Sequence, residues 1–122
     1  MLIRPKNTSS LLFDAGLEIF APGLLFIEIE RNKNSIIRKA QLSEQEFYEF
    51  LRIVKRRIMT IEERDYKELR DKADAICPDP KDIDYFALAL YLNCPVWTNE
   101  KKLKEQSIIP IYATHELMEL LK

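Results

Sequence analysis

Residues 79–113 decide the fold of this chain, and they read DPKDIDYFALALYLNCPVWTNEKKLKEQSIIPIYA. An acid-rich helix start leads into an apolar helix over residues 80–93, a strand over 96–98, a polar turn and a second strand over 109–113. Helices between short apolar strands predict an α/β fold with a parallel sheet. In such sheets ligands bind beside the carboxyl ends of the strands, where this stretch gathers carboxylates. With no histidine or cysteine among them, these carboxylates favour a Mg²⁺- or Mn²⁺-type ion.

The rest of the chain also alternates helices with short strands. Ser43 followed by Glu46 is a capping-box pattern and predicts a helix start. Pro22 stands where a first helical residue is expected. The other patterns predict helices over residues 8–15, 22–39, 62–76 and 114–121 and strands over residues 18–21 and 58–61. The apolar face that follows the capping box comprises Phe47, Phe50, Leu51 and Val54.

Length and composition bound the class of protein. A chain of 122 residues with 47% apolar and 32% charged residues is expected to form one globular domain. The net charge of −1 provides no overall basic field for nucleic acid, so any such contact has to be a local patch. No apolar run is long enough to span a membrane and no signal-peptide pattern opens the chain, so we expect a cytoplasmic protein without a membrane partner.

Several kinds of site are excluded by residue counts. The only glycines, Gly16 and Gly23, cannot build a Walker loop or a GxGxxG phosphate cradle. The single histidine, His115, leaves zinc-protease and Ser-His-Asp chemistry without their parts. Cys77 and Cys94 bracket the helix over residues 80–93, whose ends lie roughly 18–20 Å apart, so we expect two free thiols rather than a disulfide.

Glu28 is the most unusual acid of the chain. On a helical wheel Leu25 and Ile29 lie on one apolar stripe, and Glu28 falls at the edge of that stripe. A carboxylate at such an edge is costly unless something pairs with it. Two interpretations stay open, an edge residue paired with a neighbouring side chain and an inward ligand for a cation.

Three acids crowd the start of the helix over residues 80–93. Asp79 followed by Pro80 is a good N-cap and first helical residue, and Asp82 then falls where an acid complements the helix dipole. Asp84 adds a third negative charge that neither role explains. We favour the cap for Asp79 and a functional role for Asp82.

Glu100 directly follows the strand over residues 96–98. It is either an exposed first-turn residue after an Asn99 cap or a member of a site at the strand end, where Thr98 and Asn99 add supporting polar groups. Lys101 and Lys102 stand next to it and are candidates for holding a phosphate backbone, although a solvated face is an equally good interpretation.

The segment DPKDIDYFALALYLNCPVWTNEKKL resembles the third and fourth acidic motifs of PIN-domain nucleases, and FAPGLLFIEIE resembles their second motif. The resemblance covers nearly the whole chain and is strongest to small prokaryotic members, which include VapC-type toxins. It implies a three-layer α/β fold and cleavage of single-stranded RNA with Mg²⁺ or Mn²⁺ held by acids. Glu28 matches the second-motif glutamate, Asp82 the third-motif aspartate, Glu100 the usual aspartate of the fourth motif, and Thr98 the small hydroxyl residue beside it.

The start of the chain departs from the family pattern. The opening MLIRPKNTSSLLFDAG resembles the segment after the first central strand, so that strand and its catalytic aspartate are missing from the pattern. Asp14 does not replace that aspartate, because it lies in a helical pattern with no apolar strand before it. We therefore expect a single PIN-like domain over residues 1–122, N-terminally truncated, with little or no nuclease activity as written.

Three functional hypotheses follow. The first is a metal-dependent endoribonuclease, with an antitoxin-like protein as a possible partner. The second is a non-catalytic module that binds nucleic acid or protein through a PIN-like surface. The third is a structural relative that pairs with itself as a homodimer, since an open sheet edge recruits partners.

Overall fold

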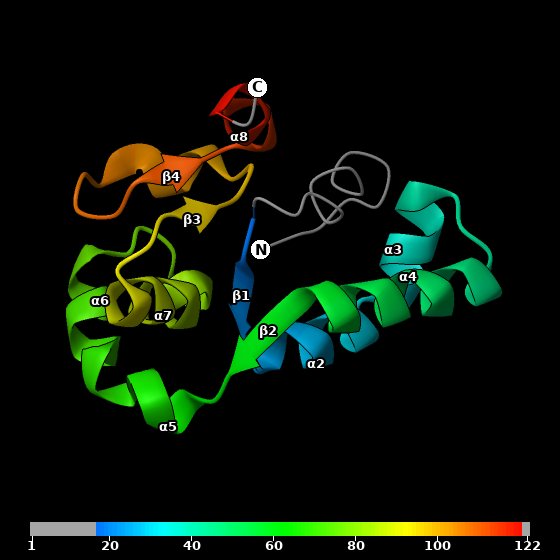
Figure 1. Cartoon of the computed structure of the whole chain (residues 1–122), viewed down its shortest axis with the longest axis horizontal. Coiled ribbons are helices and arrows are strands. Elements are labelled where there is room, and N and C mark those ends of the chain that lie inside the picture. The colour runs from blue at the N-terminus through cyan, green and yellow to red at the C-terminus, as the bar shows by residue number, and fades with distance from the viewer. Residues whose placement is uncertain (1–16, 121–122) are drawn as a thin grey trace. The chain divides into compact units, whose positions relative to one another are not determined.

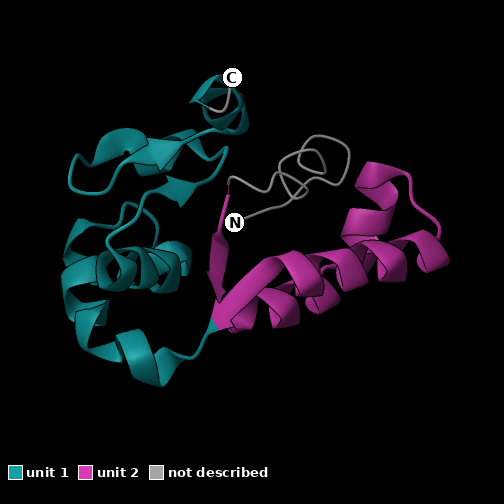
Figure 2. Cartoon of the chain, viewed as in Figure 1, with its two compact units in different colours: residues 1–2, 61–122 teal, residues 3–60 magenta. Residues whose placement is uncertain are grey.

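The computed structural model describes residues 17–120. These residues form two compact units, which we call the N-terminal unit (residues 17–60) and the C-terminal unit (residues 61–120) (Figure 2). The helix expected over residues 8–15, Asp14 and the departure at the first strand all lie outside the described residues. The single domain expected over residues 1–122 stays a prediction. No helix within residues 17–120 is long and apolar enough to cross a membrane.

The N-terminal unit is mostly helical and holds one two-stranded sheet, in which β1 pairs with β2 (Figure 1). Its elements are, in chain order, β1 (Ile19–Pro22), α2 (Leu24–Arg31), α3 (Lys33–Ala40), α4 (Glu44–Arg57) and β2 (Ile58–Ile61), whose last residue is counted with the C-terminal unit.

The capping box predicted for α4 is confirmed. The Glu46 amide donates to Ser43 Oγ at 3.1 Å, and the Ser43 amide donates to Glu46 Oε1 at 2.9 Å. Two backbone donors that a helix start leaves unpaired are thereby satisfied. The four residues of the predicted apolar face are all buried, and each buried aromatic or branched side chain contributes roughly 1.5–3 kcal/mol.

The helix predicted over residues 22–39 is two helices that start later. Pro22 ends β1 and is fully buried, and α2 begins only at Leu24. Asn32 then separates α2 from α3, and its side-chain amide donates to the Glu28 carbonyl at 2.8 Å, beside the ordinary helical bond of its backbone amide at 3.0 Å. Asn, Asp and Ser side chains that bond to nearby backbone in this way compete with helix continuation.

The C-terminal unit alternates helices with two short strands. Its elements are, in chain order, α5 (Glu63–Tyr66), the 3-10 helix η1 (Lys67–Leu69), α6 (Arg70–Ile76), the 3-10 helix η2 (Pro80–Asp82), α7 (Ile83–Leu92), β3 (Val96–Trp97), the 3-10 helix η3 (Lys101–Glu105), β4 (Ile111–Tyr112) and α8 (Thr114–Leu120). The helix predicted over residues 62–76 is therefore interrupted, and Tyr66 stands at the interruption with φ −117° and ψ 0°.

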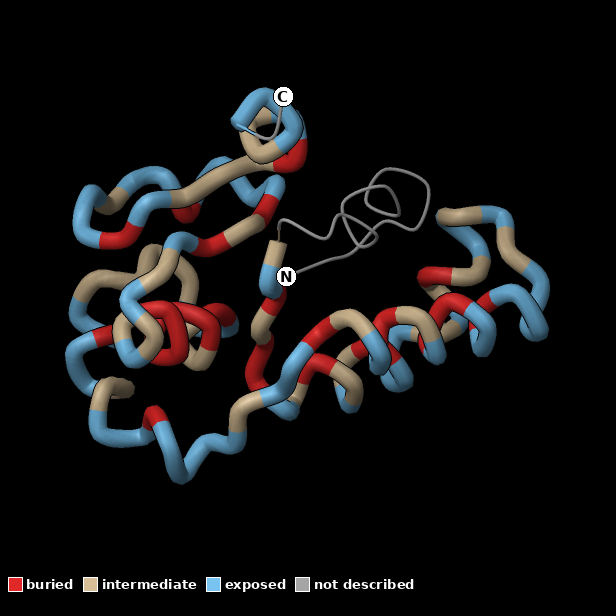
Figure 3. Tube along the Cα trace, viewed as in Figure 1, coloured by how far each residue is buried: buried red, intermediate tan, exposed pale blue. Residues whose placement is uncertain are grey.

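Helix α7 is the core of the C-terminal unit. It contacts α5, α6 and β3, and five consecutive residues from Tyr85 to Ala89 are buried (Figure 3). A helix that is apolar nearly all round belongs inside a protein rather than at its surface. Asn93 ends it in the left-handed region, with φ 53°, a conformation that asparagine tolerates better than most residues.

Strands β3 and β4 are parallel, with Val96 opposite Ile111 and Trp97 opposite Tyr112. The Thr98 amide extends the ladder by donating to the Tyr112 carbonyl at 3.0 Å. Helix α7 contacts β3 and α8 contacts β4. The predicted α/β class, with a short parallel sheet flanked by helices, is confirmed.

Candidate functional site

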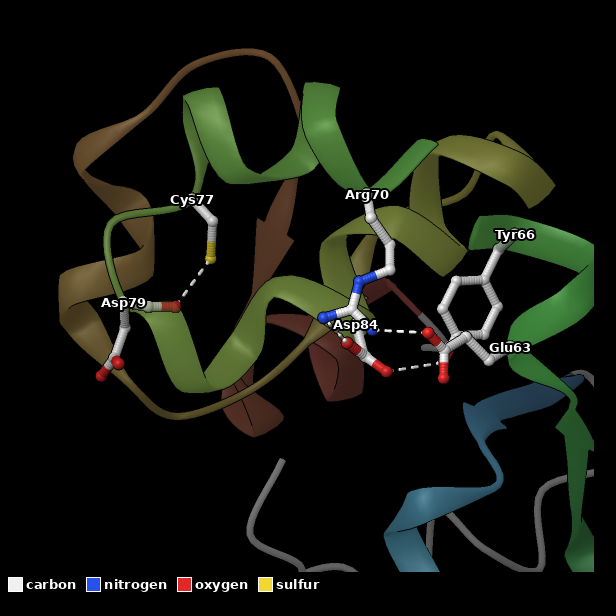
Figure 4. A network of polar contacts seen from close by, with 6 residues as sticks. All are labelled: Glu63, Tyr66, Arg70, Cys77, Asp79 and Asp84. Carbon is white, nitrogen blue, oxygen red and sulfur yellow. Dashed lines mark hydrogen bonds and ion pairs between the residues drawn. The ribbon is translucent and has the colours of Figure 1, made fainter. Parts of the chain in front are cut away.

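The turn between α6 and α7 gives its three acids three different surroundings. Asp79 Oδ1 accepts a hydrogen bond from the Lys81 amide at 3.1 Å, and Pro80 is the first residue of η2. The N-cap role predicted for Asp79 is therefore confirmed. The backbone carbonyl oxygen of Asp79 also accepts a hydrogen bond, from the Cys77 thiol at 3.0 Å (Figure 4). Cys77 and Cys94 are both free thiols, as expected.

Asp84 is a structural residue. Its Oδ2 accepts from the Tyr66 hydroxyl at 2.8 Å, and its Oδ1 lies 3.3 Å from Arg70 Nη2 (Figure 4). Arg70 also donates to Glu63 at 2.7 Å, so one network ties the start of α7 to α5 and α6. Burial, followed by the bond to Asp84, raises the pKa of Tyr66 well above its usual range. The acid that local sequence roles left unexplained thus has two partners from other helices.

Asp82 is the acid without such partners. The residue is 6% exposed, and its Oδ2 is buried with no hydrogen-bond partner among the described residues. Burial raises the pKa of this carboxyl group, and the nearby charges of Asp79 and Glu100 raise it further, while nearby positive charges, Lys81 among them, oppose the rise. A charged buried carboxylate without a hydrogen-bond partner is costly, so this environment favours the protonated form of the group.

Glu100 is held at the carboxyl end of β3. Its amide donates to Thr98 Oγ1 at 3.1 Å, and Thr98 is itself buried and joined to β4. The supporting role of Thr98 in a functional site stays a prediction. Asn99 does not cap the turn that follows it, since its Oδ1 accepts from the Thr114 amide at 2.9 Å and satisfies the start of α8 instead.

Lys81 lies between two of these acids. Its Nζ is 3.7 Å from Asp79 Oδ2 and 3.7 Å from Glu100 Oε1. It thus brings the turn before α7 together with the end of β3, the two places where the sequence predicted a site. We call Asp79, Asp82 and Glu100 the acidic cluster, and Lys81 is the member of this neighbourhood that the sequence analysis missed. Its only signal in the sequence was its place inside the DPKD turn.

The acidic cluster fits a hard divalent cation by its chemistry. All its donors are carboxylate oxygens, which Mg²⁺ and Mn²⁺ prefer, and the unpartnered Asp82 Oδ2 supplies a buried lone pair. The cluster does not form a complete metal-binding site, however. Within residues 17–120 no three acidic, histidine or cysteine side chains are grouped closely enough to hold an ion.

The remaining predicted residues lie apart from this turn in the chain. Glu28 is half-buried on α2 and belongs to the N-terminal unit. Its convergence with Asp82 and Glu100 therefore stays a prediction. Lys101 and Lys102 are exposed in η3, directly after Glu100, and nucleic-acid binding by them also stays a prediction.

Comparison with known proteins gives one match. A family model described as the PIN domain matches residues 1–118 of the 122-residue chain. Neither the curated proteins nor the solved structures contain a match. The matched range includes every residue of the acidic cluster together with Glu28.

Proposed function

This chain belongs to the PIN-domain family, and from that premise we propose that it is a metal-dependent endoribonuclease that hydrolyses single-stranded RNA, with a toxin-like role. Family membership supports a nuclease-type function in general. The observation that supports the metal dependence is the buried carboxylate oxygen of Asp82, which has no hydrogen-bond partner within residues 17–120 and lies near two further acids. Buried titratable groups with shifted pKa values gather at functional sites more often than elsewhere.

The proposed roles follow from where each side chain lies. Asp82 and Glu100 would hold a Mg²⁺ or Mn²⁺ ion, with Glu28 as the third ligand expected from the family pattern. Asp79 fixes the turn that carries Asp82, and Thr98 fixes the backbone of Glu100. Lys101 and Lys102 would bind RNA phosphates near the acidic cluster. When bound, such an ion supplies an acidified water and screens the charge of the phosphate being cleaved.

The test is cleavage of a fluorescently labelled single-stranded RNA by the purified chain with and without Mn²⁺. We expect slow, Mn²⁺-dependent cleavage that Asp82→Asn abolishes and that the matched variant Asp84→Asn retains, since Asp84 is engaged in the structural network. The sequence pattern predicts weak activity, so the assay uses excess protein and long incubation. Cleavage that survives in Asp82→Asn, or no metal-dependent cleavage at all, would contradict the proposal.

A non-catalytic binding module is the second candidate. It is favoured by the absence of an assembled three-ligand metal group among residues 17–120. For this candidate we expect salt-sensitive RNA binding in a gel-shift assay, without turnover and without a need for Mn²⁺. An RNA complex that requires Mn²⁺ and is lost in Asp82→Asn would count against it.

We also propose an antitoxin-like protein partner and a homodimer, both by analogy with VapC-type toxins. The native mass of the purified chain by light scattering tests the homodimer directly. A monomer at all concentrations would leave that part of the proposal wrong while leaving the nuclease proposal standing.

A further inference from the structure

Helix α4 separates its charges along its length. Its first half carries only acidic charges, and its last two turns carry only basic ones, at Arg52, Lys55, Arg56 and Arg57. The helix dipole favours cations only in the last turn, so it accounts for the final three but not for Arg52. Arg52 and Arg56 are also like charges four residues apart, a spacing that destabilises a helix. The basic end of α4 therefore carries more positive charge than the helix itself explains.

These cations have few partners within the fold. Arg52 and Arg56 are exposed, and neither forms an ion pair within residues 17–120. Lys55 is exposed too, and its ammonium group lies 5.8 Å from the centre of the Phe26 ring on α2, a contact that leaves the charge without a carboxylate. In a chain whose net charge is −1, such a group is a local basic patch that fits a polyanion.

An exposed aromatic ring adjoins this basic patch. Tyr48 stands four residues before Arg52, so the two side chains share one face of α4. The Tyr48 hydroxyl accepts from Lys33 Nζ at 3.0 Å, and the ring packs edge-on against Phe47, with 5.3 Å between ring centres. Tyr48 is nevertheless 46% exposed. An aromatic ring that is held in place and exposed is a platform on which a nucleobase can stack.

We propose that the outer face of α4 is a docking surface for single-stranded RNA, which we call the α4 surface. It consists of four residues, Tyr48, Arg52, Lys55 and Arg56. The three cations bind backbone phosphates and the tyrosine ring stacks on a base. An acidic protein would match the charges alone, whereas RNA offers both phosphates and bases. The inference rests on the RNA ligand of the proposed function, but it needs neither a metal ion nor the acidic cluster.

Removing two charges from the α4 surface should weaken RNA binding and its salt dependence. Arg52→Gln/Arg56→Gln places good helix formers at exposed positions, so this variant should fold like the parent. Each phosphate contact with a single strand contributes about 0.7 to the slope of log affinity against log salt, so the slope should fall by about 1.4 and the affinity at 0.15 M salt by roughly tenfold.

Lys67→Gln/Lys72→Gln is the charge-matched control. Both lysines are exposed, and neither forms an ion pair within the described part of the chain. Unlike the arginines of α4, each has an acid next to it in the sequence, Glu68 and Asp71 respectively. Because these acids offset the lysine charges, RNA binding by this variant should stay within about twofold of the parent.

Two substitutions of Tyr48 test the stacking. Tyr48→Leu removes the ring and should weaken RNA binding by about fivefold or more, whereas Tyr48→Phe keeps the ring and should stay within about twofold of the parent. Both variants lose the hydroxyl bond to Lys33, so the difference between them reports the ring alone.

The experiment is a fluorescence anisotropy titration of a labelled oligouridylate with the whole chain, in EDTA and over a range of salt concentrations. The EDTA prevents metal-dependent cleavage during the measurement. Weaker binding by Arg52→Gln/Arg56→Gln and by Tyr48→Leu, with binding retained in the two controls, supports the inference. A loss in only one of these variants overturns it, and tight binding of labelled polyglutamate would then point to an acidic protein instead.

The outcomes also separate the α4 surface from the nuclease proposal. No RNA binding by the parent, or RNA binding that all α4 variants retain, overturns the α4 surface. If Mn²⁺-dependent cleavage is then still observed and is lost in Asp82→Asn, the nuclease proposal stands without it. Losses confined to the α4 variants in a chain that cleaves no RNA support the α4 surface and leave the nuclease proposal wrong.

Discussion

Replacing Asp82 by asparagine should stabilise the metal-free protein while removing its proposed function. The change keeps the shape of the side chain and deletes a negative charge that the fold buries. In the parent, Asp82 Oδ2 has no hydrogen-bond partner among the described residues, and Asp79 and Glu100 add like charges nearby. A group retained at the expense of stability is typical of functional sites.

The size of the effect follows from the burial of this oxygen. A buried polar group without a partner costs about 1–3 kcal/mol, and more when charged. Because an asparagine carbonyl at the same place stays partly unsatisfied, we expect a gain of about 1–2 kcal/mol at neutral pH. For a chain of this length each kcal/mol raises the melting temperature by roughly 3–6 °C, so the melting temperature should rise by about 3–12 °C.

The effect should depend on pH with a definite sign. Burial raises the pKa of Asp82, so the folded protein holds the proton more tightly than the unfolded chain does. The stability contributed by that proton is present below about pH 4, the ordinary range of an aspartate, and is lost as the pH rises through the raised value. The advantage of Asp82→Asn should therefore be small at acidic pH and complete at neutral pH.

Asp84→Asn is the matched control, two residues away in the same turn. Its carboxylate accepts from the buried Tyr66 hydroxyl and pairs with Arg70, so its loss should cost about 1–2 kcal/mol. Thermal melts followed by circular dichroism in metal-free buffer, from acidic to neutral pH, measure both variants. If Asp82→Asn destabilises the protein as much as Asp84→Asn does, the Asp82 carboxylate has a partner and our account of this turn is wrong.

Three further predictions concern single groups elsewhere. Ser43→Ala removes the cap of α4 and should cost about 1 kcal/mol in a denaturant melt, whereas Ser43→Asp should cost far less; equal losses would contradict the cap. Tyr66→Phe should lower the free energy of unfolding by about 1 kcal/mol. In the parent, one of the five tyrosines should stay un-ionised in an absorbance titration to about pH 11, because burial raises the pKa of Tyr66. Burial also raises the pKa values of the Cys77 and Cys94 thiols. Their alkylation at pH 8 should therefore be slower than that of free cysteine and should become faster as the pH rises. Rapid labelling at pH 7 would refute this.

Local patterns in the sequence predicted the local structure well. The capping box at Ser43 and the buried face that follows it formed as expected, because both depend on residues within two turns of one helix. The Asp79 cap formed for the same reason, and the strand predicted over residues 58–61 is β2. The PIN-domain resemblance, carried by two short motifs, is confirmed by the family match over residues 1–118.

Two long helices were predicted wrongly, and both failed at a single residue. At Asn32, where α2 ends, the side-chain amide bonds to the Glu28 carbonyl, a local competition that apolar periodicity does not detect. Tyr66 interrupts the second helix, and its ring is 1% exposed while its hydroxyl reaches Asp84, 18 residues further along the chain. Helical spacing around Tyr66 contains no sign of that distant partner.

The acids of the turn before α7 show which features the sequence determines and which only the tertiary structure determines. By itself the sequence determined that Asp79, Asp82 and Asp84 share one turn and that Glu100 follows a strand, because chain order and helical periodicity fix such positions. Only the tertiary structure decided that Asp84 is bonded to Tyr66 and Arg70 and that Lys81 reaches Glu100. It also decided that Asp82 is buried, with one carboxylate oxygen that has no hydrogen-bond partner among the described residues. The physical reason is that burial and hydrogen bonding depend on elements far apart in the chain, and these determine whether a carboxylate finds partners within the fold.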